Sequence, residues 1–120
     1  MGKRGRRSKR TKGRGEPTLP EPTRLVKLLS AYPAAKLDLH GYSAAHAESR
    51  VRSFLATEAR KSEGQVVHVI TGKGAGSEGV AVLLGLVRDL LDEEVGRTVQ
   101  EYAGLMGGGG WVVRIAGGSR

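Results

Sequence analysis

The 120-residue sequence contains no cysteine, which excludes a disulfide framework and thiolate metal sites. A chain without cysteine also tolerates a reducing compartment. Long apolar runs are missing as well: the longest, VAVLLGLV at residues 80–87, is far below the roughly 20 residues of a membrane span. The basic N-terminus lacks the apolar stretch and small-residue cleavage site of a signal peptide. We therefore expect a soluble, cytoplasmic protein.

Acidic side chains are absent from residues 1–15, which hold three lysines and five arginines. The rest of the chain has twelve basic and twelve acidic residues, so the net charge of +8 belongs to this arm. With almost no apolar side chain to bury, the arm is expected to be disordered. Its composition favours nucleic acid as a partner over a membrane surface, which would need apolar anchors; a role in solubility alone is the alternative. The basic residues of the arm are Lys3, Arg4, Arg6, Arg7, Lys9, Arg10, Lys12 and Arg14.

The domain organisation follows from composition and length. Three prolines in EPTLPEPT, residues 16–23, indicate a stiff linker after the arm. The remaining chain is long enough for one small domain but not for two. We expect residues 1–22 to form the arm and linker, and residues 23–120 to form a single domain.

Hydrophobic periodicity predicts a short leading helix and then the order β-α-β-α-β-β. In the last helix the acids Asp92, Glu93 and Glu94 oppose the helix dipole, so we expect its final turn to fray or end early. The expected strands are residues 36–40, 66–71, 98–103 and 111–116, and the expected helices begin at caps Thr23, Ser43 and Ser77 and end before Pro33, Gly64 and Gly96.

This order predicts an α/β fold: a two-layer sandwich with a four-stranded mixed sheet. The first three strands should be parallel with right-handed crossovers, and the closing hairpin makes the last strand antiparallel. Ligands bind at the carboxyl ends of strands in open α/β sheets. His40 and Gly41, the loop after Thr71 and the hairpin loop before Trp111 should therefore meet at one edge of the sheet.

The sequence LDLHG at residues 37–41 places two polar groups on one face of a strand. Leu37 and Leu39 share one face, so Asp38 and His40 share the other, about 7 Å apart along the strand. They can address a common ligand, and histidine is the usual proton-transfer group near neutral pH. The alternative is structural, with Asp38 solvated and His40 bonded to a backbone group at the strand end.

The sequence TGKGAGSEG, residues 71–79, joins a strand to a helix through four glycines and Lys73. Such loops let backbone N–H groups and the helix start approach a phosphate, with the lysine as a point charge. The alternative is a flexible connection. A Walker phosphate loop is absent, and although G-x-G-x-x-G occurs here, the chain has too few βα units for a dinucleotide-binding fold.

The chain also contains a run of four glycines, one tryptophan and two further histidines. The glycines at residues 107–110 permit close backbone approach or form a loose hairpin. Trp111 is expected in the core more than in base stacking. His46 and His68 are interpreted as structural, and no group of residues has convincing metal-ligand spacing.

LDLHG, the T-G-x-G of residues 71–74 and the GGGG before the last strand resemble, in order and spacing, the Smr (small MutS-related) domain family over residues 36–116. The resemblance implies a two-layer α/β domain that binds nucleic acid and, in many members, cuts it endonucleolytically. His46 departs from the glutamate common in the family. The resemblance and the strand-end positions together predict Asp38 and His40 as the catalytic residues. The residues predicted to bind nucleic acid are Gly41, Thr71, Gly72, Lys73, Gly74, Gly107, Gly108, Gly109, Gly110, Arg4, Arg6, Arg7, Lys9 and Arg10.

The hypothesis for the reaction is that glycine-loop amides and Lys73 hold a phosphodiester while His40, oriented by Asp38, transfers the proton. On RNA the 2′-hydroxyl can be the nucleophile without a metal, whereas on DNA water must attack and a divalent ion such as Mg²⁺ or Mn²⁺, held partly by Asp38, is favoured. No other cofactor is expected. The rival hypothesis is a non-catalytic RNA-binding or ribosome-binding module that uses the same edge and arm.

Overall fold

The structure is a computed structural model that describes residues 21–72 and 78–117. The predicted order of elements is confirmed, including the short leading helix. In chain order they are α1 (Pro22–Ser30), β1 (Ala35–Asp38), α2 (Ala44–Lys61), β2 (Val66–Ile70), α3 (Glu78–Glu94), β3 (Val99–Gly104) and β4 (Gly110–Ile115).

The four strands form one mixed sheet in the order β1-β2-β4-β3, as the sequence predicted for the fold class. Strands β1 and β2 are parallel, and β4 is antiparallel to both β2 and β3. Strand β3 therefore runs in the same direction as β1 and β2. The hairpin does not simply extend the sheet, because β4 inserts between β2 and β3.

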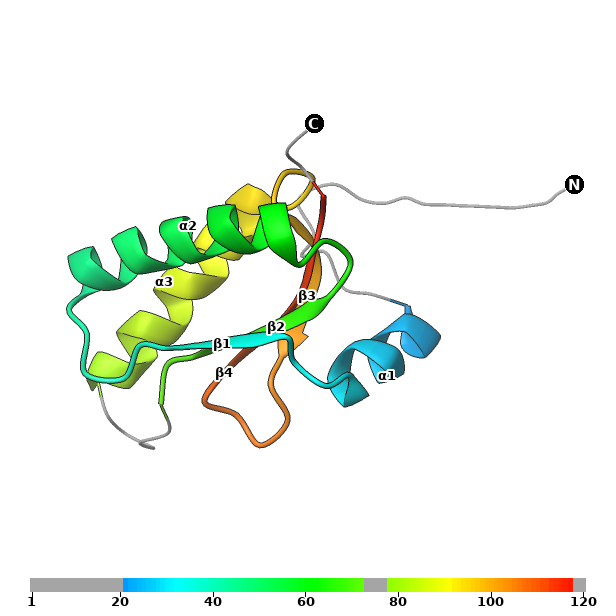
Figure 1. Cartoon of the computed structure of the whole chain (residues 1–120). Helices are drawn as coiled ribbons and strands as arrows, with labels where there is room; N and C mark the ends of the chain where they lie inside the picture. Colours follow the sequence, from blue (N-terminus) through cyan, green and yellow to red (C-terminus); the bar gives the residue numbers. More distant parts are fainter. Residues whose placement is uncertain (1–20, 73–77, 118–120) are drawn as a thin grey trace, which may run out of the picture.

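Helices α2 and α3 cover one face of the sheet, and α1 lies on the other (Figure 1). The main core lies beneath α2 and α3, where alternate strand residues such as Leu37, Val69 and Val113 meet Leu55 and Leu91 of the helices. This alternation is the period-2 pattern of strands with one face in the core. On the opposite face α1 buries a smaller cluster, which consists of Leu28, Val66, Ala103 and Val112.

Helix α2 starts at its expected cap, whereas α1 starts earlier than expected. Ser43 is the N-cap of α2, and its Oγ accepts a hydrogen bond from the backbone N–H of His46 at 3.2 Å. Helix α1 begins two residues earlier than expected, with Glu21 rather than Thr23 as N-cap, and the Glu21 side chain makes no capping hydrogen bond. Pro22 fits the first helical position because its φ is already helical and it has no N–H to leave unpaired there. The expected cap Ser77 lies outside the described residues.

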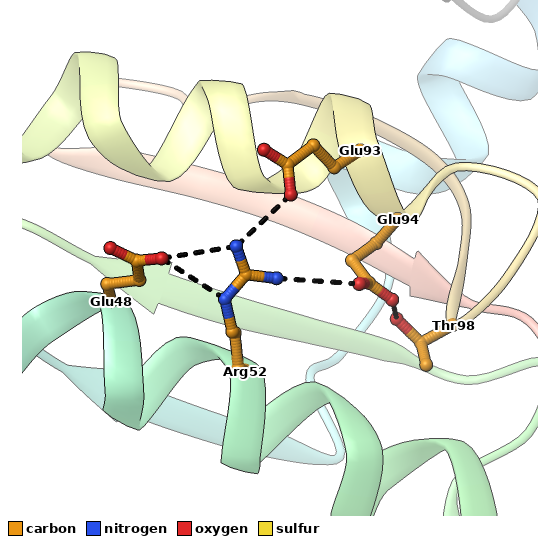
Figure 2. A network of polar contacts seen from close by, with 5 residues as sticks. All are labelled: Glu48, Arg52, Glu93, Glu94 and Thr98. Atoms are coloured by element: carbon orange, nitrogen blue, oxygen red, sulfur yellow. Dashed lines mark hydrogen bonds and ion pairs between the residues drawn. The ribbon is translucent and has the colours of Figure 1, made fainter.

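The expectation that α3 frays at its acidic end is wrong, because the helix continues to Glu94. Figure 2 shows the cause: Arg52 of α2 reaches across to this end. Its Nη2 lies 3.2 Å from Glu93 Oε1, and its Nη1 lies 4.0 Å from Glu94 Oε2. Glu48 accepts from the same guanidinium at 3.1 Å, and Thr98 Oγ1 donates to Glu94 at 2.7 Å. A charge from another helix thus offsets the unfavourable dipole interaction.

Trp111 belongs to the core, which is the more favoured of its two sequence-based interpretations. Its ring packs edge-on against Tyr102, with ring centroids 5.7 Å apart. Its indole N–H donates to the carbonyl oxygen of Leu84 at 3.2 Å, which satisfies the polar end of the side chain. Within residues 21–72 and 78–117, no helix has the length and apolar character needed to cross a membrane.

Candidate active site at the carboxyl ends of the strands

Three chain segments meet at one end of the sheet, which we call the strand-end rim: residues 38–41, residues 71–72 and the hairpin loop 105–109. Backbone hydrogen bonds join them. The N–H of Leu39 donates to Ile70 O at 2.7 Å, and the N–H groups of Thr71 and Gly72 both donate to Gly109 O, at 2.8 and 3.1 Å. The segments that the sequence predicted to converge at one edge therefore do converge.

Asp38 and His40 form a hydrogen-bonded pair on the rim. Asp38 Oδ1 accepts the backbone N–H of His40 at 3.1 Å and lies 2.9 Å from ring atom Nδ1 of His40. Leu37 and Leu39 are buried, so the two polar side chains project from the opposite face. Both are open to solvent, with 54% of the Asp38 side chain and 76% of the His40 side chain exposed.

The geometry of this pair sets its electrostatics and its orientation. The hydrogen bond from the His40 side chain, followed by that from the His40 backbone, lowers the pKa of Asp38 below its usual value. Asp38 is therefore a carboxylate at neutral pH and holds the imidazole through Nδ1. The other ring nitrogen, Nε2, is left for a ligand on the exposed side.

Gly72 brings backbone against His40. Its φ is +105°, and a Cβ built on it would lie 3.4 Å from His40 Cβ. A side chain at this position would be strained and would crowd the Cβ of His40. Gly41, with φ +82°, makes the turn after His40, and a Cβ there would meet no atom within 4 Å. Both glycines thus shape the backbone immediately around the Asp38–His40 pair.

Thr71 lies beneath the rim rather than on its surface. Its side chain is fully buried, and strand alternation puts it on the same side as Val67 and Val69. Within the described part of the chain, its Oγ1 has no hydrogen-bond partner. A buried hydroxyl without a partner is uncommon in folded proteins.

The glycine run of the hairpin divides into two roles. Gly107, Gly108 and Gly109 have φ values of +85°, +81° and +85°, which glycine adopts readily. Gly110 is buried, and a Cβ on it would lie 2.4 Å from Val69 O. The close backbone approach predicted for this run thus occurs at Gly110, where it is made with strand β2 of the same chain.

Several predicted site residues lie outside the described residues. They include Lys73 and Gly74 of the loop after β2 and the arm residues Arg4, Arg6, Arg7, Lys9 and Arg10. Among residues 21–72 and 78–117, no three histidine, aspartate or glutamate side chains are grouped so that they could hold a metal ion.

Two features near the sheet were not identified from the sequence. Tyr42 stacks on His46 with ring centroids 4.5 Å apart, which agrees with a structural role for that histidine. At the end of the sheet opposite the rim, Glu101 is buried between Arg24 and Arg114. This cluster gave no sequence signal, because it depends on the β3–β4 register and on the position of α1.

Comparisons with known proteins show the family of the chain. A family model described as the Smr domain matches residues 37–113, well over half of the chain. A protein of Treponema pallidum (strain Nichols), named "Uncharacterized protein", is 44% identical over 62 residues. The match covers 52% of this chain and 30% of that protein, so it spans under a third of the relative. The chain belongs to the Smr domain family, which is associated with nucleic-acid binding and nuclease activity.

Proposed function

We propose that the protein is an endonuclease that breaks phosphodiester bonds of nucleic acid at the strand-end rim. The observation that carries this proposal is the exposed Asp38–His40 pair, with its 2.9 Å contact between Oδ1 and Nδ1. An imidazole held by a carboxylate through one nitrogen and open at the other is a common arrangement for general base catalysis. Gly72 has no side chain, so its backbone could approach a phosphate that is bound beside His40.

RNA is the substrate that these groups suit best. Nε2 of His40 would take the proton from a 2′-hydroxyl while the 2′-oxygen attacks the adjacent phosphorus. The bond from phosphorus to the 5′-oxygen then breaks, and that oxygen takes a proton from water. The products are a 2′,3′-cyclic phosphate end and a 5′-hydroxyl end. Asp38 keeps the ring oriented and stabilises the imidazolium that forms.

A resident divalent ion fits the described residues poorly. Asp38 Oδ1 is occupied by two hydrogen bonds from His40. The described part of the chain brings no group of three ligating side chains together there. Protein sites for Mg²⁺ and Mn²⁺ draw mainly on oxygen ligands. We therefore derive no step through a metal.

The basic arm would add affinity without sequence discrimination. Its eight positive charges can each displace a counterion from the phosphate backbone. Removing residues 1–15 should weaken binding to all nucleic acids alike and reduce the dependence of affinity on salt, while the domain keeps its melting temperature. Unchanged affinity in this truncated chain would show that the arm is not a binding element.

The testing experiment incubates the full chain with structured RNA and with supercoiled DNA, with and without EDTA. Asp38→Asn and His40→Ala should each abolish most cleavage. Asp89→Asn is the matched control, since Asp89 is an exposed aspartate on α3, on the face of the molecule away from Asp38. Analysis of RNA ends for cyclic phosphate tests the chemistry. Cleavage that persists in His40→Ala would overturn the proposal, and binding without cleavage would favour the rival module.

A further inference from the structure

A polar hollow of about 350 Å³ lies between α1 and the strands β3 and β4, on the sheet face that carries Asp38 and His40. It is at the other end of the sheet from the rim, since Arg114 pairs with Val66 at the start of β2. We call it the α1 pocket, and its lining residues are Arg24, Lys27, Gln100, Glu101 and Arg114.

The pocket is built around a buried carboxylate that holds two arginines. Arg24 Nη2 lies 3.0 Å from Glu101 Oε1, and Arg114 Nε lies 3.0 Å from Glu101 Oε2. Only 6% of the Glu101 side chain is exposed. Arg114 Nη1 also donates to the carbonyl oxygen of Gly64 at 3.0 Å, which fixes the guanidinium further. Two positive groups are therefore positioned before any ligand arrives.

The charges of the pocket do not balance. Arg24, Lys27 and Arg114 supply three positive charges, whereas Glu101 supplies one negative charge. No ion pair is formed by Lys27 with any residue of the described ranges. One arginine would suffice to neutralise Glu101, so the second arginine and the lysine leave a net positive hollow. Guanidinium groups fixed in this way suit the planar, multidentate recognition of phosphate oxygens.

We propose that the α1 pocket is a phosphate-binding site that holds a backbone phosphate of the nucleic acid bound at the rim. This inference rests on the proposed function. Asp38 is level with Gly110, and Arg114 lies four residues further along β4 and two strands away. With strand geometry of about 3.3 Å per residue and about 4.8 Å between strands, the two positions are about 16 Å apart. They would therefore contact phosphates several nucleotides apart.

The test uses duplex DNA as a probe for backbone-phosphate binding and the full chain with Asp38→Asn, so that no nucleic acid is cut during the measurement. Lys27→Gln removes one pocket charge without breaking an ion pair of the described residues, and Arg60→Gln is the control for loss of one exposed charge elsewhere. On duplex DNA the salt slope should fall by about 0.9 for Lys27→Gln, with a several-fold loss of affinity. Arg60→Gln should leave both unchanged. The double variant Arg24→Gln, Lys27→Gln should lose about twice as much slope, and its melting temperature reports whether the fold survives.

A second measurement separates nucleic acid from a free phosphate compound. Adenosine monophosphate and inorganic phosphate are titrated while the backbone amide signals of Lys27 and Gln100 are followed by NMR. Shifts there together with the DNA effect support backbone contact. Shifts without a DNA effect would overturn the backbone contact and assign the pocket to a free phosphate compound instead. No shift, and equal DNA affinity in Lys27→Gln and Arg60→Gln, would overturn the inference even if rim cleavage is intact. Loss of cleavage alone would count only against the proposed function.

Discussion

Two acid–base pairs occupy opposite ends of the same sheet face, and they differ mainly in exposure. Asp38 and His40 are 2.9 Å apart, and Glu101 and Arg114 are 3.0 Å apart. In the first pair 54% and 76% of the two side chains are exposed, whereas in the second the values for Glu101 and Arg114 are 6% and 23%. The two pairs therefore have similar distances but lie in very different environments.

Exposure decides what each pair can do. Water and salt screen the attraction between Asp38 and His40, so that pair adds little to stability but presents its imidazole to ligands. Glu101 has lost most of its hydration and depends on its arginine partners, so removing a partner would leave an unfavourable buried charge. The rim end of the sheet is therefore free for chemistry, while the α1 end is constrained by folding.

The largest expected effect is on activity at the rim. His40→Ala should lower the rate of RNA cleavage about 100-fold or more, because the general base is lost. Its melting temperature should stay within a degree or two of the original, since an exposed pair contributes little to stability. Single-turnover cleavage and thermal unfolding of the same preparation measure both. A large drop in melting temperature would remove the contrast with the buried pair.

The next effect is on stability at the other end. Glu101→Gln should lower the free energy of unfolding by about 2 kcal/mol, because two arginines lose their charged partner and the hydrogen bonds become weaker. For a domain of this size that is a fall of roughly 10 °C in melting temperature. Chemical denaturation measures the free energy.

The control for Glu101→Gln is Glu48→Gln, which removes the charge of an exposed partner of Arg52. It should change the free energy of unfolding by less than about 0.5 kcal/mol. Equal destabilisation by the two glutamate variants would show that burial does not distinguish them.

Local sequence patterns predicted the rim well and the opposite end poorly. Alternation placed Asp38 and His40 on one face, and the parallel connections brought their strand end beside Gly72 and the hairpin. Nothing in the local sequence specifies that β4 inserts between β2 and β3, since a hairpin can dock by either strand. The contacts that depend on this order were therefore not predictable.

The acidic end of α3 shows the same limit. Helix-dipole reasoning predicted an early end, but Arg52, 41 residues away from Glu93, holds that turn in place. The pairing of Glu101 with Arg24 likewise joins β3 to a helix at the start of the chain. Long-range ion pairs require the tertiary arrangement, so pattern and propensity alone do not reveal them.

A smaller effect is expected where the hairpin meets β2. In Gly110→Ala the new Cβ would lie 2.4 Å from Val69 O, and its nearest neighbours are all backbone atoms of Val69 and Ile70, which have little room to move. We expect a loss of about 1.5 kcal/mol in the free energy of unfolding. Gly104→Ala is the control, since its Cβ would meet only a Trp111 ring carbon at 4.0 Å. If both variants are equally stable, the close approach at Gly110 is not a constraint, and the rim is less rigid than the hydrogen bonds imply.

The smallest effect concerns His68 of β2, which lies between the two pairs on the sheet face that also carries α1. Burial, followed by the charge of Lys36, lowers the pKa of His68 below its usual value of 6.5. The unfolded chain therefore binds a proton at higher pH than the native chain, so stability is complete above 6.5 and is lost as the pH falls through the native pKa. His68→Gln should reduce the loss of melting temperature between about pH 7.5 and about pH 5, whereas His46→Gln, at an exposed position, should not. An unchanged pH profile in His68→Gln would mean that the His68 side chain is more hydrated in the folded chain than its half-buried position indicates.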